Sequence, residues 1–266
     1  MEGFQLDTIY NMDCLEGMKM IPDNSIDLVA TDCPYKIMSG GCTKSVPDYA
    51  ECGEILTHRK TVKRTDWVDD VRTGKMFADN DIQFSEWLPE IYRVLKEQAH
   101  CYIMVNSRNL KDLQTEAEKV GFQFHNLLIW DKGNATPNRW YMQAHECILF
   151  LRKGRAFNIN NLGTSTLLRV PNIHGGKLHP TEKPVDLMRI MIENSTQEGG
   201  IVLDTFMGSA PTAVACIRTH RHYIGFELNK EYYDKANERI KNELAQLEMR
   251  YSEFENHSMG KHHGEN

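Results

Sequence analysis

Three strand-like runs of the sequence end in an acidic residue. Mostly apolar residues precede Asp32, Asp204 and Glu227. In an open α/β sheet, ligands bind beyond the carboxyl ends of the strands, so carboxylates at these positions are placed where chemistry would occur. The segment Cys33–Tyr35 continues directly from the first acid with a proline and an aromatic residue. A ligand site and a strand that simply ends in a proline turn both account for this motif.

A glycine turn follows the second acid. Gly208 permits a backbone conformation that other residues avoid and lets a ligand approach closely. Ser209 is expected to cap the next helix, with Pro211 in its first turn. The turn lacks the GxGxxG pattern that binds a pyrophosphate, whereas Glu227 lies about 20 residues downstream, where a carboxylate binds ribose hydroxyls. A ligand with a ribose but no phosphate is indicated, and S-adenosylmethionine fits this description.

A third motif, His179-Pro180-Thr181-Glu182-Lys183-Pro184, precedes a helix-like segment. The simple interpretation is a helix start with Thr181 as the N-cap and Pro184 in the first turn. In a ligand site, the free backbone donors and Lys183 are suited to holding a carboxylate, such as that of a methionine group.

Strand-like and helix-like runs alternate along the chain, which is typical of an α/β sheet covered by helices. The predicted strands are 8–11, 27–31, 100–105, 126–130, 147–152, 201–204 and 222–226. The predicted helices are 14–20, 84–96, 110–120, 184–193, 212–219 and 230–248. An apolar stripe on the last helix predicts packing against the sheet.

Two stretches, at about 36–81 and 155–178, do not fit this alternation. Loops of this length inside a compact domain tend to be functional or disordered. We therefore expect one domain spanning residues 1–266 with two insertions. The first insertion contains Cys42, Cys52 and His58, whose spacing matches no common zinc finger, so no metal is expected.

Composition restricts the function further. The 266 residues carry a formal net charge of −6, which argues against a protein that coats nucleic acid non-specifically. The seven scattered cysteines indicate reduced thiols rather than a disulfide framework. Neither a signal peptide nor an apolar run long enough for a bilayer is evident, so a cytoplasmic protein without membrane contact is expected.

Taken together, the motifs resemble those of the β-group amino-methyltransferases that act on DNA. The catalytic motif Asp32–Tyr35 comes first, His179–Pro184 next and the cofactor motif Asp204–Ala210 last, as in that family. The segment Asn11–Leu15 also resembles its opening motif, and Trp130–Lys132 and 145–150 resemble later segments. The resemblance implies a Rossmann-like S-adenosylmethionine-dependent methyltransferase sheet with circularly permuted motif order and helices on both faces.

The resemblance also implies roles for individual residues. The catalytic set is Asp32, Cys33, Pro34 and Tyr35. The cofactor-binding set is Asp13, Thr181, Lys183, Asp204, Phe206, Gly208, Ser209 and Glu227. The target base would leave the double helix, its amino group would donate hydrogen bonds to Asp32 and to the carbonyl of residue 33, and Tyr35 would stack on it. Thr181 and Lys183 would lie near the methionine end of the cofactor.

Four residues depart from the family pattern: Cys33, Thr205, Ala210 and Pro211. Cys33 acts through its backbone carbonyl, and nothing nearby in sequence activates its thiol. The methyl group of Ala210 is expected to crowd the ligand, because glycine is usual there. A catalytically weak DNA-binding homologue is therefore one alternative.

Because an acid at position 32 usually accompanies adenine in that family, the resemblance implies N6 of adenine in a short DNA recognition sequence as the methyl acceptor. N4 of cytosine and an RNA substrate are alternatives, whereas a nicotinamide oxidoreductase is disfavoured by the missing GxGxxG motif. Double-stranded DNA is the expected partner, and the two insertions are the candidate recognition elements. The sequence leaves open whether the chain forms a homodimer or acts beside a restriction endonuclease.

Overall fold

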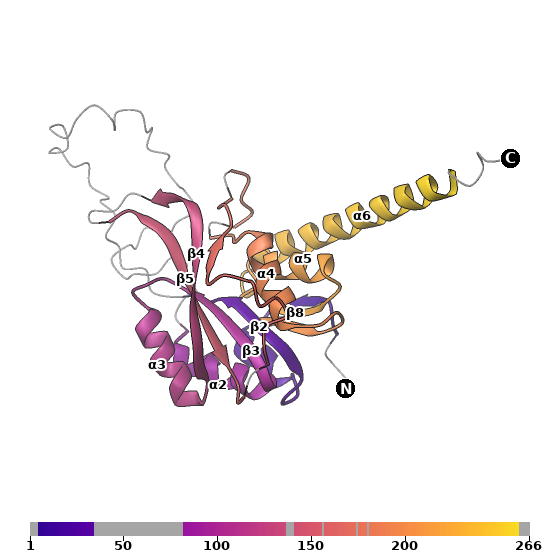
Figure 1. The fold of residues 1–266 in the computed structure, drawn as a ribbon. Helices are drawn as coiled ribbons and strands as arrows, with labels where there is room; N and C mark the ends of the chain where they lie inside the picture. Colours follow the sequence, from indigo (N-terminus) through magenta and orange to yellow (C-terminus); the bar gives the residue numbers. More distant parts are fainter. Residues whose placement is uncertain are drawn as a thin grey trace, which may run out of the picture.

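The computed structural model describes residues 5–34, 82–136, 141–155, 157–173, 175–179 and 181–260. Within them, one eight-stranded sheet has the order β1-β8-β7-β2-β3-β5-β4-β6 (Figure 1). The strands are β1 (Thr8–Tyr10), β2 (Ile26–Asp32), β3 (Leu95–Val105), β4 (Gln123–Thr136), β5 (Gln143–Arg152), β6 (Leu167–Arg169), β7 (Ile201–Asp204) and β8 (His222–Phe226). The helices are α1 (Cys14–Lys19), α2 (Phe84–Val94), α3 (Leu110–Val120), α4 (Val185–Ser195), α5 (Pro211–Arg218) and α6 (Lys230–Gly260).

The five strands β1, β8, β7, β2 and β3 are parallel, whereas β5 is antiparallel to both β3 and β4. The carboxyl ends of the parallel strands therefore meet at one edge of the sheet. The neighbours β8, β7 and β2 bring the three strand-end acids of the sequence to that edge. The α/β prediction is confirmed, and the sheet supplies the expected position for a ligand.

Two apolar cores lie on opposite faces of the sheet. Residues of α1, α2 and α3 belong to one core, and residues of α4, α5 and α6 belong to the other. The expectation of helices on both faces is confirmed. No described helix combines the length and the apolar character that crossing a bilayer requires.

Several elements differ from the sequence prediction. The second predicted helix ends at Val94, because Leu95 takes an extended conformation and pairs with Ile26 in the sheet. The short edge strand β6 lies within the second predicted insertion and was not predicted, since Leu168 is its single buried residue and gives no period. The first insertion lies outside the described residues, together with its Cys42, Cys52 and His58, and the single-domain organisation stays a prediction.

The helix α1 approaches β8 unusually closely at Gly17. A Cβ atom at this position would lie 2.0 Å from Cε1 of Phe226. Because ring and strand are both packed in the core, Gly17→Ala is expected to lower the free energy of unfolding by about 1–3 kcal/mol. Urea-induced unfolding measures this change. Glu16→Ala, at an exposed position of the same helix, should stay within about 0.5 kcal/mol of wild type; an unchanged Gly17→Ala midpoint would contradict the close packing.

Candidate active site

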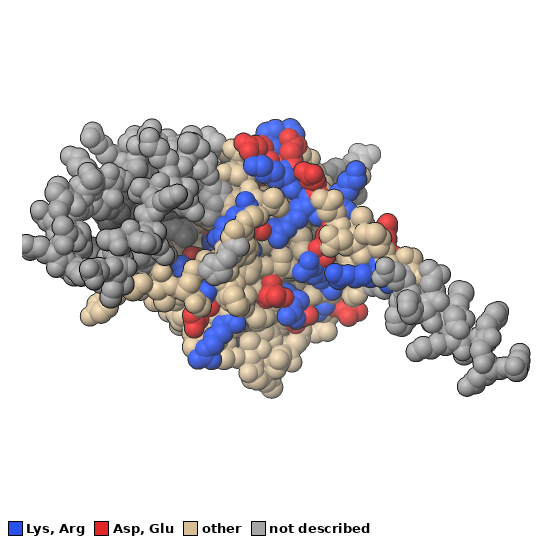
Figure 2. Space-filling view, turned by 90° about the horizontal axis from the view of Figure 1, so that it is seen from above, with Lys and Arg blue, Asp and Glu red and all other residues tan. Residues whose placement is uncertain are grey.

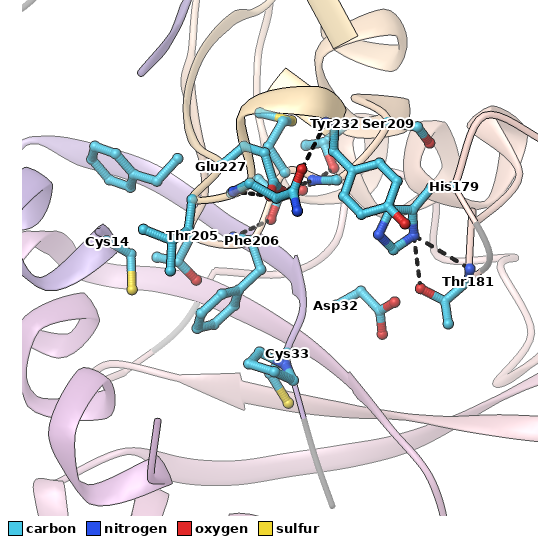
Figure 3. A pocket seen from close by; sticks show the side chains of 18 of the residues that line it. Cys14, Asp32, Cys33, His179, Thr181, Thr205, Phe206, Ser209, Glu227 and Tyr232 are labelled. Carbon is cyan, nitrogen blue, oxygen red and sulfur yellow. Dashed lines mark hydrogen bonds between the residues drawn. The ribbon is translucent and has the colours of Figure 1, made fainter. Parts of the chain in front are cut away.

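The predicted site residues surround one cavity of about 210 Å³ at the carboxyl edge of the parallel strands (Figure 3). Those that line it are Asp13, Asp32, Cys33, Pro34, Thr181, Lys183, Asp204, Phe206, Gly208, Ser209 and Glu227. Tyr35 lies outside the described residues. The structure thus brings together side chains as far apart in the sequence as Asp13 and Glu227. Their individual roles stay predictions.

Asp204 is fully engaged within the protein. Its Oδ1 accepts hydrogen bonds from Thr31 Oγ1 at 2.7 Å and from the backbone N–H of Phe206 at 3.1 Å, and its Oδ2 accepts one from Thr212 Oγ1 at 2.5 Å. The Thr205 hydroxyl, at the position where the family has proline, lies 3.2 Å from that of Thr31. Through these hydrogen bonds, Asp204 fixes the backbone of the turn that follows β7.

Glu227 fixes the other side of the same turn. Its Oε2 accepts a hydrogen bond from the N–H of Gly208 at 2.9 Å, and its Oε1 accepts one from the N–H of Asn229 at 2.8 Å. Gly208 has φ +54°, in the left-handed region that favours glycine. Burial raises the pKa of the Glu227 carboxyl above its ordinary value. The acid lines the cavity at the predicted ribose position.

The start of α5 corrects two expectations. Ala210, not Ser209, is the N-cap residue, and no side chain caps this helix; Ser209 instead accepts hydrogen bonds from Arg239 through its carbonyl and hydroxyl oxygens. Ala210 adopts φ +61°, which explains why glycine is usual there. It is buried and is not among the cavity-lining residues, so the expected crowding of the ligand by its methyl group is not seen.

The cavity wall beside Asp32 includes His179, Thr181 and Tyr232 (Figure 3). The rings of His179 and Tyr232 meet edge to face at 4.2 Å, and His179 Nδ1 accepts hydrogen bonds from the N–H and hydroxyl of Thr181. Burial, and then nearby lysines, lower the pKa of His179 to about 4. Thr181 was expected to cap α4, but Pro184 is the N-cap residue, without a side-chain hydrogen bond.

The first predicted cofactor residue, Asp13, is the N-cap of α1 and accepts a hydrogen bond from the N–H of Leu15 at 2.7 Å. On the same side of the cavity, the ring of Phe206 packs edge to face on Trp87 at 5.3 Å. Trp87 belongs to α2 and is fully buried. Because this contact holds the ring in place, Phe206 presents a fixed apolar surface to the cavity.

Asp32 has the most distinctive surroundings in the site. Its Oδ2 accepts a hydrogen bond from Lys183 Nζ at 2.5 Å, while its buried Oδ1 has no hydrogen-bond partner among the described residues. Burial raises the pKa of this carboxyl to about 6, against the attraction of Lys183. A buried acceptor without a donor is costly. The Oδ1 atom is therefore suited to an N–H group that a ligand brings.

Lys183 contacts a second acid in addition to Asp32. Its ammonium also lies 3.3 Å from Oε2 of Glu146 and 3.2 Å from the carbonyl of Thr181, so it bridges two acids. Sequence reasoning did not select Glu146 or its partner Lys132, although both fall in segments that resemble the family. Their pairing arises between strands and leaves no local pattern in the sequence.

The thiol of Cys33 is buried and hydrogen-bonded within the protein. The Sγ atom donates a hydrogen bond to the carbonyl of Met104 at 3.4 Å. Burial, and then the charge of Asp32, raise the pKa of this thiol well above its ordinary value. Because only a thiolate is an effective nucleophile, covalent chemistry at Cys33 is disfavoured.

The charge of the cavity restricts its ligand. Acidic side chains outnumber the cationic ones among the described lining residues, because Lys183 is the single lysine or arginine there and His179 is neutral. The acids are Asp13, Asp32, Glu182, Asp204 and Glu227. Such a cavity repels a pyrophosphate and favours a positively charged ligand. A sulfonium compound with an adenosine group, which is S-adenosylmethionine, fits this set of residues.

The permuted sheet and its acid-lined cavity define an S-adenosylmethionine-dependent methyltransferase. The chain belongs to the N6/N4 family of DNA methylases, whose family model matches residues 26–238. Members of this family are DNA methyltransferases that use S-adenosylmethionine.

Individual relatives agree with this assignment. Type II methyltransferase M2.MboI of Moraxella bovis is 27% identical over 264 residues, which cover 90% of this chain and 91% of that protein. The crystal structure of the M1.HpyAVI–SAM complex is 25% identical, with a TM-score of 0.62, and the match covers 87% of this chain and 98% of that one. PvuII DNA methyltransferase, described as cytosine-N4-specific, shares the fold at 17% identity and a TM-score of 0.61, over 90% of this chain and 92% of that one.

Proposed function

We propose that this DNA methyltransferase methylates N6 of adenine in a short duplex sequence after the base leaves the helix. The observation that supports this most strongly is Asp32 at the edge of the cavity. One of its oxygens is bound to Lys183, and the other has no donor among the described residues. The target amino group must leave the base stack to reach such a buried site.

The chemistry follows from the state of the amino nitrogen. Its lone pair is delocalised into the base ring, so it is a poor nucleophile. Asp32 Oδ1 and the carbonyl oxygen of Cys33 accept hydrogen bonds from its two N–H groups and so favour a tetrahedral nitrogen. The Asp32 carboxylate stabilises the positive charge that develops on this nitrogen. When bound, S-adenosylmethionine supplies a methyl group on a positively charged sulfur. Asp13, Phe206 and Glu227 are proposed to hold its adenosine part.

The choice of base rests on the acid at position 32, which in the resembling family accompanies adenine, whereas serine accompanies cytosine. Digestion of methylated duplexes to nucleosides, followed by mass spectrometry, tests this choice. N6-methyldeoxyadenosine is expected. N4-methyldeoxycytidine would overturn the choice of base, transfer only to RNA would overturn the substrate, and no transfer to any nucleic acid would indicate the catalytically weak homologue.

We further propose that the second predicted insertion takes part in the recognition of DNA. Figure 2 shows lysine and arginine side chains, with acidic ones among them, on the described part of one face. Within the second predicted insertion, Arg169 ends the edge strand β6, and its side chain is 75% exposed. An exposed arginine on a strand can reach a phosphate or a base edge. We therefore keep residues 155–178 as a candidate recognition element.

The surroundings of Asp32 predict how methyl transfer depends on pH. Below its pKa of about 6 the carboxyl is protonated and cannot accept both hydrogen bonds. The single-turnover rate at saturating cofactor and DNA should therefore rise with pH through about 6 and level off above 7. An aspartate with an ordinary pKa would place this rise near pH 4. A rate that is flat between pH 5 and 7 would contradict the assigned environment of Asp32.

A further inference from the structure

Four charged side chains form an alternating row that ends at Asp32. Lys132 Nζ lies 3.3 Å from Glu146 Oε1, Glu146 Oε2 lies 3.3 Å from Lys183 Nζ, and Lys183 Nζ lies 2.5 Å from Asp32 Oδ2. Lys132 and Glu146 are not among the residues that line the cavity. The row therefore extends from the proposed catalytic carboxylate to residues outside the lining of the cavity.

The sheet explains how Glu146 reaches this row. On β5, Cys147 pairs with Val105, the last residue of β3, so Glu146 stands one residue beyond the end of that strand. On its other side, Glu146 pairs with Trp130 of β4, two positions before Lys132. Because β3 stops here, the gap between β2 and β5 admits the Lys183 side chain.

The row is buried enough for its charges to matter. The side chains of Lys183 and Lys132 are 5% and 10% exposed, and that of Glu146 is 22% exposed. Burial by itself would raise the pKa of Glu146, but the two lysines outweigh it and lower this pKa below its ordinary value. Glu146 is therefore ionised whenever Asp32 works, and the four charges sum to zero.

A lysine that is paired with Asp32 alone would bind its carboxylate tightly and weaken it as an acceptor. We propose that Glu146 is a positioning residue for methyl transfer, which shares Lys183 with Asp32 and so keeps the Asp32 carboxylate a strong acceptor for the target amino group. Lys132 in turn neutralises part of the Glu146 charge and so limits how strongly Glu146 attracts Lys183 away from Asp32. This inference rests on the proposed role of Asp32.

The groups that act on Asp32 give the sign of the expected effect. Lys183, from the segment before α4, lowers its pKa, whereas Glu146 of β5 and Asp204 of β7 raise it; the neighbouring Cys33 thiol is neutral. Removing the Glu146 charge takes away a repelling neighbour and leaves Lys183 to Asp32. Removing the Lys132 charge does the opposite, because Glu146 then attracts Lys183 more strongly.

The test compares pH profiles of single-turnover methyl transfer for Glu146→Gln and Lys132→Gln. Glu146→Gln is expected to move the rise to lower pH by about one unit and to reduce the plateau rate about threefold, because a less basic carboxylate is a weaker acceptor. Lys132→Gln is expected to move the rise to higher pH. Calorimetric affinity for S-adenosylmethionine should stay unchanged in both variants.

The matched control is Glu243→Gln, which removes another buried glutamate, ion-paired to Arg218 at 2.7 Å, away from the cavity. Its profile should match wild type. Opposite shifts in the two test variants support the proposal, since a merely structural loss would lower the rate without moving the profile. Unmoved profiles, or shifts in the same direction, overturn it. If Asp32→Ala itself remains active, the proposed function fails instead, so the two failures are distinguishable.

Discussion

Replacement of Asp32 by alanine is expected to reduce the methyl-transfer rate by at least about 10²–10³-fold while leaving the affinity for S-adenosylmethionine close to wild type. The carboxylate has one oxygen free of any partner among the described residues, whereas the proposed adenosine contacts lie elsewhere in the cavity. Transfer of a labelled methyl group to duplex DNA measures the rate, and titration calorimetry measures the affinity.

The control for this variant is Asp186→Ala, which removes an exposed acid of α4 that pairs with Arg189. Asp32→Ala is expected to fold, because Lys183 retains Glu146 and the carbonyl of Thr181 as partners. Thermal unfolding measures whether it does. Full activity of the Asp32→Ala protein would show that the catalytic assignment is wrong.

Replacement of Glu227 by alanine is expected to weaken binding of S-adenosylmethionine by about 10- to 100-fold, the effect of losing a hydrogen bond to a charged group. The carboxylate also holds the N–H groups of Gly208 and Asn229. Its removal is therefore expected to loosen the turn after β7 as well as to remove the proposed ribose contact. Titration calorimetry on the isolated protein gives the affinity without any dependence on DNA.

Glu227→Gln separates these two contributions. The amide keeps one oxygen for the turn but loses the charge that favours a cationic ligand, so an intermediate affinity is expected. An affinity equal to wild type in Glu227→Ala would remove this residue from the ribose site. If that variant also had a lower unfolding temperature, Glu227 would be assigned to the fold alone.

Much of the candidate site could be predicted because it lies at strand ends. Asp32 and Asp204 each end a buried run, and Glu227 directly follows one; parallel strands bring such positions to one edge of a sheet whatever the loops do. Gly208 could be selected for the same reason, since a sharp turn between strand and helix requires its backbone freedom. The order of the three motifs, through its resemblance to the DNA amino-methyltransferases, also predicted the permuted motif order of the sheet.

Interactions between distant segments could not be predicted. The expected helix cap at Ser209 was wrong, because its carbonyl and hydroxyl oxygens accept hydrogen bonds from Arg239, 30 residues away. The expected cap at Thr181 was also wrong, although its hydroxyl partner His179 lies only two residues away in the same motif. The pairing of Lys183 with Glu146 depends on where β3 stops. The local sequence pattern also does not give the exact ends of a strand. The start of β3 at Leu95 is set by its pairing with β2, which the pattern does not show.

The departures from the family pattern also required the structure for their interpretation. The sequence shows that Ala210 stands where glycine is usual, but only the backbone shows that the position has φ +61° and lies outside the cavity lining. Similarly, Thr205 replaces a proline, and its hydroxyl joins the polar group around Thr31 and Asp204. Both substitutions are therefore compatible with an intact cofactor site.

The most direct test of the account is a crystal structure of this protein with a non-reactive S-adenosylmethionine analogue and a duplex that contains its recognition sequence. The account predicts an extrahelical adenine whose N6 atom lies within about 3.2 Å of Asp32 Oδ1, beside the cavity that holds the analogue. A target base that remains stacked in the duplex, or an amino group that binds a different side chain, would contradict it.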